Sequence, residues 1–168
     1  MQDVTNILLR WRAADERQLL LQVVQPALIG LIDGALSTLA PVFAAAYLAG
    51  SRSALFVGLA AALGAAISMG LSEGLSDDGR LTGRGAALTR GLITGLATFL
   101  GGSFHALPFL ISDVGTALVV AYILVGVELV AIAWIRKRYL RVGLARSLVQ
   151  VTLGGAVIAA VGILLGHS

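Results

Sequence analysis

The sequence contains no cysteine, only two histidines, and few charged residues, which make up 12% of the chain. Without cysteine there is no disulfide framework, no thiolate metal site and no cysteine nucleophile. A soluble domain has about 25% charged residues, so this composition argues against a soluble protein. With no HExxH pattern and so little histidine, we do not expect an enzyme.

Apolar residues dominate instead: 58% of the chain is hydrophobic, and its mean hydropathy is +0.93. We therefore expect an integral membrane protein, and 168 residues leave little room for a soluble domain beside it. The net charge of +3 does not indicate nucleic acid, because the basic residues cluster between apolar runs, as the flanking loops of a membrane protein do.

Five apolar stretches predict membrane-spanning helices, for which about 20 residues are needed. They cover approximately residues 24–49, 54–75, 86–111, 114–135 and 148–165. The fold class we expect is thus an all-α membrane domain, residues 24–168, with five transmembrane helices. Before it, residues 1–23 form a short amphipathic helix at the membrane surface, because Val4, Ile7, Leu8 and Trp11 recur at helical spacing.

Orientation follows from the basic residues. An odd number of spans puts the termini on opposite sides, and Arg52 then lies apart from all the other lysine and arginine residues. The positive-inside rule predicts a cytoplasmic N-terminus and an outside C-terminus, in the cell (inner) membrane.

Two local features stand out in the first span. Pro41 removes a backbone donor, so we expect a kink or local opening near Ser37. Gly30 and Gly34 form a small-xxx-small pair, which suits either a dimer interface or packing within the chain.

Asp33 is the most unusual residue of the sequence. It lies roughly 13 Å into the first apolar span, at about 1.5 Å per residue. An ionisable group there costs at least about 2.5 kcal/mol, so it is a functional candidate by default. We interpret Asp33 as part of a site that handles a cation or a proton.

Three further residues fall at a comparable depth in the cytoplasmic half: Met69 and Glu73 in the second span and Glu128 in the fourth. If their helices are neighbours, three carboxylates and a thioether converge. Carboxylates bind divalent cations and protons, and a thioether favours late first-row metals such as Fe(II). The predicted metal site is therefore Asp33, Met69, Glu73 and Glu128.

Other interpretations stay open for each. Glu73 is near enough to the interface to be merely solvated, and Glu128 is a candidate for a structural bridge to Arg90 or Arg136. Met69 alone is more typical of core packing. His105 is either an exit-side ligand, a proton relay or, with more weight, a hydrogen-bonded packing residue.

In its motifs the sequence resembles the vacuolar iron transporter family of Fe(II)/Mn(II) transporters. The matching elements are Asp33-Gly34, the segment SMGLSEGLS at residues 68–76 and the five-span layout. It is most similar to the membrane domain of bacterial membrane-bound ferritin (rubrerythrin-like) fusions, through PALIGLIDGALSTLAPVFAAA, SMGLSEGLSDDGRLTGRG and VELVAIAWIRKRY. The resemblance covers residue 25 to the C-terminus.

The resemblance implies a homodimer with the ion path near its interface, exporting Fe2+ or Mn2+ from the cytoplasm in exchange for protons, with no cofactor. Asp33 and Met69 match the family's intramembrane metal-path positions, and Glu73 matches the acidic residue of the second-span motif. Glu128 is assigned mainly from its depth.

Two departures concern metal delivery. Eukaryotic members have a glutamate-rich cytosolic insert where this chain has only the loop 76–85, and the fusions carry a ferritin-like domain, of which residues 1–22 are at most the tail. The alternative function is therefore a non-transporting membrane scaffold or subunit that binds a soluble ferritin-like partner. A third is a transporter of another substrate, such as Zn(II), Co(II) or protons alone.

Overall fold

The computed structural model describes residues 14–167 and leaves out residues 1–13 and 168. Most of the predicted amphipathic helix over residues 1–23 thus lies outside the described residues, and from Ala14 the chain is helical. The described part contains helices and turns and no β-strand. The all-α class predicted from the sequence is confirmed for this part of the chain.

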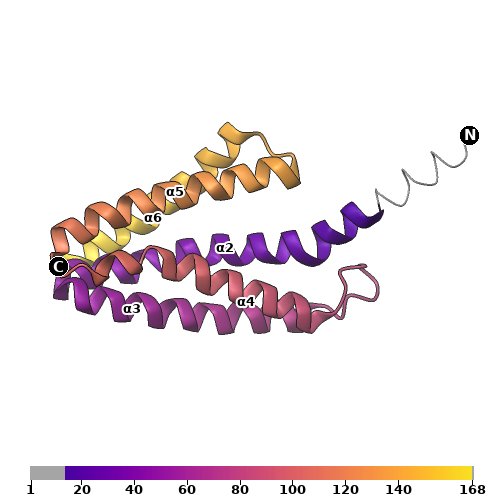
Figure 1. Cartoon of the computed structure of the whole chain (residues 1–168), viewed down its shortest axis with the longest axis horizontal. Helices are drawn as coiled ribbons and strands as arrows, with labels where there is room; N and C mark the ends of the chain where they lie inside the picture. The colour runs from indigo at the N-terminus through magenta and orange to yellow at the C-terminus, as the bar shows by residue number, and fades with distance from the viewer. Residues whose placement is uncertain (1–13, 168) are drawn as a thin grey trace, which may run out of the picture.

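The helices run back and forth along one long axis (Figure 1). A π-helical turn, η1 (Leu20–Val24), leads into α2 (Gln25–Ser37), which is followed by α3 (Leu39–Ser76) and α4 (Ala87–Phe104). The short 3-10 helix η2 (Leu107–Leu110), α5 (Val114–Leu140) and α6 (Leu144–Gly166) complete the chain. Figure 1 shows the α3–α4 loop, the α5–α6 loop and η1 at one end, and the C-terminal end of α6 at the other.

The first break in this path is at Thr38, between α2 and α3. Thr38 belongs to neither helix: its φ is −93° and its ψ is −13°, and its backbone N–H bonds to the Leu36 carbonyl. Pro41 has no N–H to offer the Ser37 carbonyl. The predicted opening near Ser37 is therefore confirmed.

A second, sharper break lies inside α3 at Gly50, where φ is 78° and ψ is −176°. This backbone region is open essentially to glycine alone. The two arms of α3 fold back on each other there, because a Cβ added to Gly58 would come within 2.8 Å of the Val42 side chain. In an unbroken helix these two residues would be about 24 Å apart.

Glycines let α4 pack closely against both α2 and α3. A Cβ on Gly34 would overlap the Thr98 carbonyl oxygen of α4, and one on Gly91 would come within 2.6 Å of the Gly70 carbonyl oxygen of α3. Of the two roles considered for the Gly30–Gly34 pair, the structure shows packing within the chain.

Two buried apolar clusters hold the remaining helices. One joins α3, η2 and α5 and includes Phe43 and Phe109; the other joins α2, α5 and α6 and includes Leu28 and Leu129. Outside these clusters many large apolar side chains face outward, for example Leu96, which is 65% exposed. Such an apolar exterior is typical of a surface that meets lipid.

Among the described residues, three helical stretches are long and apolar enough to cross a membrane: Ala14–Ser76, Val114–Leu140 and Leu144–Gly166. The first includes the reversal at Gly50, so it is not one straight helix. These stretches are compatible with the membrane protein that composition predicts.

Two helix ends differ from the sequence prediction. Helix α4 stops at Phe104, short of residue 111, and gives way to η2, because Pro108 cannot donate a helical hydrogen bond. Helix α5 continues to Leu140, past residue 135, although its last turns are basic. Glu128 consequently lies near the middle of α5, farther from its C-terminal end than the apolar run to residue 135 indicates.

Candidate functional site

The four predicted metal-site residues come from three helices: Asp33 from α2, Met69 and Glu73 from α3, and Glu128 from α5. Among residues 14–167 no three or more His, Asp or Glu side chains lie together as a group that could hold a metal ion. The structure thus does not bring the three predicted carboxylates together within one chain. Each has different surroundings, described in turn.

Asp33 is half-buried and accepts no hydrogen bond from any described residue. Ile29 and Ser37, one helical turn to either side, are both exposed. Since residues four apart share a helix face, Asp33 lies on a face of α2 that the described chain leaves uncovered. Its carboxylate is available to a ligand or to a second molecule.

Glu128 and His105 form a buried pair between α5 and the end of α4. The Nδ1 atom of His105 lies 3.3 Å from Oε2 of Glu128, and the two residues are 0% and 8% exposed. On the other side of the ring, Nε2 of His105 lies 2.7 Å from Oγ1 of Thr38, at the break between α2 and α3. Three helical segments therefore meet in one hydroxyl–imidazole–carboxylate chain.

The single hydroxyl proton of Thr38 has three alternative acceptors: the Gly34 carbonyl oxygen at 2.9 Å, the Gly102 carbonyl oxygen at 3.4 Å and Nε2 of His105. When it is donated to Gly34, Nε2 must itself carry a proton, and Nδ1 and Glu128 then share one more. When it is donated to His105, Nδ1–H donates to the carboxylate and the pair holds one proton fewer. The chain can thus hold or release a proton with every bond between His105 and its two partners kept.

The side chain of Asp33 points away from the side of α2 on which Glu128 of α5 lies. A Cβ on Gly101 would touch Leu31 and Ala35 of α2, and Oε1 of Glu128 at 3.3 Å. Leu31 and Ala35 share a face, and Asp33, two residues from each, points about 200° away from them. The two carboxylates therefore do not converge within the chain, and Glu128 is not part of the metal site we propose below.

Glu73 is occupied by two arginines. Its Oε1 accepts from Nη2 of Arg84 at 2.6 Å and from Nε of Arg90 at 2.9 Å, and its side chain is 10% exposed. The merely solvated Glu73 considered from the sequence is thus wrong. So is the bridge from Glu128 to Arg90 or Arg136, because Arg90 binds Glu73 and Arg136 binds Gln150. Met69, one turn before Glu73, is half-buried.

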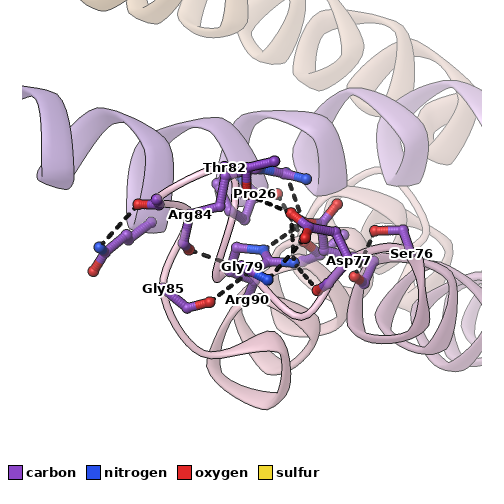
Figure 2. A network of polar contacts seen from close by, with 12 residues as sticks. Pro26, Ser76, Asp77, Gly79, Thr82, Arg84, Gly85 and Arg90 are labelled. Atoms are coloured by element: carbon purple, nitrogen blue, oxygen red, sulfur yellow. Dashed lines mark hydrogen bonds and ion pairs between the residues drawn. The ribbon is translucent and has the colours of Figure 1, made fainter.

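The side chain of Arg90 lies inside the α3–α4 loop and binds loop residues on several sides (Figure 2). Its fully buried guanidinium also donates to the carbonyl oxygens of Gly85 at 2.8 Å and Asp77 at 2.7 Å. Hydrogen bonds from the Thr82 hydroxyl and the Gly79 N–H, with the arginine charges nearby, lower the pKa of Asp77 below its usual value. The acidic pair Asp77-Asp78 thus forms a hydrogen-bonded turn.

Residues 70–74, Gly-Leu-Ser-Glu-Gly, match the spacing of a hydrolase nucleophile elbow. That motif needs its serine on a sharp turn between a strand and a helix. Ser72 instead lies within α3, exposed, and with no described hydrogen-bond partner that could act as a base. The match therefore carries no catalytic assignment.

Thr38 is the residue that sequence reasoning undervalued. A threonine in a helix commonly bonds back to a carbonyl one turn earlier, and the Thr38 hydroxyl does so at Gly34, 2.9 Å away. Its second contact, to His105, depends on the reversals at Gly50 and at the α3–α4 loop, which bring residues far apart in sequence together. No family model, curated protein or solved structure matches the chain.

Proposed function

We propose that this protein is a divalent transition-metal transporter that moves Fe2+ or Mn2+ out of the cytoplasm in exchange for protons. The observation that carries the proposal is Asp33, a carboxylate without a described partner, in the middle of an apolar segment. An ionisable residue in such a segment is costly and needs a functional reason. The motif resemblance to the vacuolar iron transporters supplies the substrate class.

The metal path in this proposal passes Asp33 and Met69. Asp33 lies on a face of α2 that its own chain does not cover, so a homodimer with these faces together would place two carboxylates near each other. Carboxylate oxygens suit Mn(II), and a thioether adds a soft ligand that favours Fe(II) over Ca(II). Metal binding at such a site releases the carboxylates from mutual repulsion, and metal departure favours their protonation.

The proton path in this proposal uses Thr38, His105 and Glu128. Their hydrogen bonds accommodate two states that differ by one proton. In the state with fewer protons the Thr38 hydroxyl turns from Gly34 to His105. Gly34 directly follows Asp33, so this change reaches the helical turn that presents the metal carboxylate. That connection offers a physical basis for coupling the two ions.

The topology in this proposal has five crossings: α2 together with the first arm of α3, the second arm of α3, α4, α5 and α6. The α3–α4 and α5–α6 loops lie at the same end in Figure 1. Among residues 14–167 the basic side chains lie at that end except Arg52, which follows the Gly50 turn. The positive-inside rule then favours a cytoplasmic position for both loops.

The test is metal uptake into proteoliposomes that contain a pH-sensitive dye, comparing wild type with Asp33→Asn. We expect Fe(II) to move together with protons in the opposite direction, and both movements to be lost in Asp33→Asn. Asp78→Asn is the matched control, because Asp78 is a solvent-exposed loop residue that pairs only with Arg80. It should transport as wild type does. Metal flux that survives in folded Asp33→Asn contradicts the assignment.

A second candidate function is a membrane scaffold that binds a soluble ferritin-like partner. The observation in its favour is that Glu73 and Glu128 are both engaged in contacts between segments of the chain. A scaffold predicts no metal binding by the purified protein, and no flux in either direction of pH gradient. Under it, Asp33→Asn should be tolerated in every assay.

A further inference from the structure

A groove opens between α2 and the α5–α6 hairpin, at the end that holds the α5–α6 loop. Its volume is about 560 Å³, within the range of about 300–1,000 Å³ typical of small-molecule sites. In Figure 1 the α5–α6 pair diverges from α2 towards this end. The walls are apolar and come from both sides: Leu28, Ile32 and Leu36 from α2, and Leu140 and Val151 from the hairpin.

The rim of the groove is polar and cationic. Arg136, Gln150 and Gln25 line it, and Nη2 of Arg136 donates to Oε1 of Gln150 at 3.1 Å. Arg136 is half-buried, and no described carboxylate pairs with it. Most of its five N–H groups therefore remain for a ligand.

More positive charge follows Arg136 along the hairpin, at Lys137, Arg138, Arg141 and Arg146. None of these has a carboxylate partner among the described residues. The arginines of the neighbouring loop differ, since Arg84 and Arg90 are balanced by the carboxylates of Glu73 and Asp77. The unbalanced charge at this end thus belongs to the hairpin that borders the groove.

We propose that this groove binds one anionic phospholipid, with its phosphate at Arg136 and one acyl chain along the apolar walls. Guanidinium is well suited to phosphate, because it presents several N–H groups in a planar fork. Basic pockets between membrane helices are a recognised site for anionic headgroups. A zwitterionic lipid fits the walls equally well but leaves the surplus charge unbalanced. This proposal is independent of the metal-transport proposal.

The experiment uses the full chain, purified in a neutral detergent and titrated with phosphatidylglycerol or with phosphatidylcholine of the same acyl chains. Bound lipid is counted by native mass spectrometry, and the melting temperature is measured in parallel. We expect one phosphatidylglycerol to bind preferentially and to raise the melting temperature. Arg136→Gln should weaken that binding by about fivefold to tenfold.

The matched control is Arg80→Gln, which removes the same charge at the same end from a side chain that is 89% exposed and lies outside the groove. It should bind phosphatidylglycerol as wild type does. Ile29→Trp fills the groove from its exposed rim and keeps every charge, so it should also lose the lipid.

Four outcomes overturn the proposal. Equal losses in Arg136→Gln and Arg80→Gln would mean a general charge effect. Equal binding of phosphatidylcholine would mean that the headgroup is not recognised. A melting-temperature rise with inorganic phosphate alone, abolished by Arg136→Gln but not by Ile29→Trp, would mean a free-anion site. Stabilisation that depends only on dimer formation, with no lipid retained, would assign the groove to a second copy.

Discussion

The three carboxylates within the helical bundle differ in what balances their charge. Glu73 has two guanidinium partners, and Glu128 has one imidazole. Asp33 has no described partner. A buried carboxylate with a fixed partner contributes to the geometry of the fold, whereas one without a partner is free to exchange ligands. Asp33 is therefore the strongest functional candidate of the three, whereas Glu73 and Glu128 hold segments of the chain together.

The contact between His105 and Glu128 leads to a prediction about protein stability that does not depend on transport. Replacing either residue alone with leucine leaves the other buried without its partner, which costs roughly 3–5 kcal/mol. Replacing both removes the unpaired group, so the double variant should be more stable than the two single losses added together. Thermal unfolding in detergent, followed by tryptophan fluorescence, gives the coupling energy, expected within about 0.5–3 kcal/mol.

The matched control for this cycle is the same histidine change combined with Asp113→Asn, a helix-capping residue at the start of α5 that has no contact with His105. Those two losses should simply add. If the His105 and Glu128 losses also add, the two side chains do not interact in solution, and the proton path proposed above loses its central contact.

At the scale of helices, the sequence anticipates features that depend on local chemistry. Pro41 indicates the opening at Thr38, and the helical class follows from the apolar runs. The early end of α4 is explained by Pro108, whereas the end of α5 is harder to predict, because this helix continues past residue 135 into basic residues of low hydropathy. Glu128 therefore lies nearer the middle of its helix than the apolar run indicates. Its true partner, His105, follows from tertiary reversals that no single apolar run encodes.

Helix contact through glycine gives the second prediction. Gly34→Ala places a methyl group against the Thr98 carbonyl of α4, so the helices must separate, at a cost of about 1–3 kcal/mol. Gly64→Ala is the control, because a Cβ there meets nothing within 4 Å. It should be neutral or stabilise by up to about 1 kcal/mol through helix propensity. Equal melting temperatures for the two variants would contradict the close α2–α4 contact.

At the scale of the whole molecule, the arrangement of the ends can be tested against the membrane, and the absence of cysteine makes the test clean. Leu81→Cys labels the basic end, where Leu81 is 99% exposed, and Ser112→Cys labels the opposite end beside η2. Because the basic end should face the cytoplasm, an impermeant maleimide should label Ser112→Cys in intact cells and Leu81→Cys only after permeabilisation. The reverse pattern would contradict the orientation, and labelling of both from outside would contradict an odd number of crossings between them.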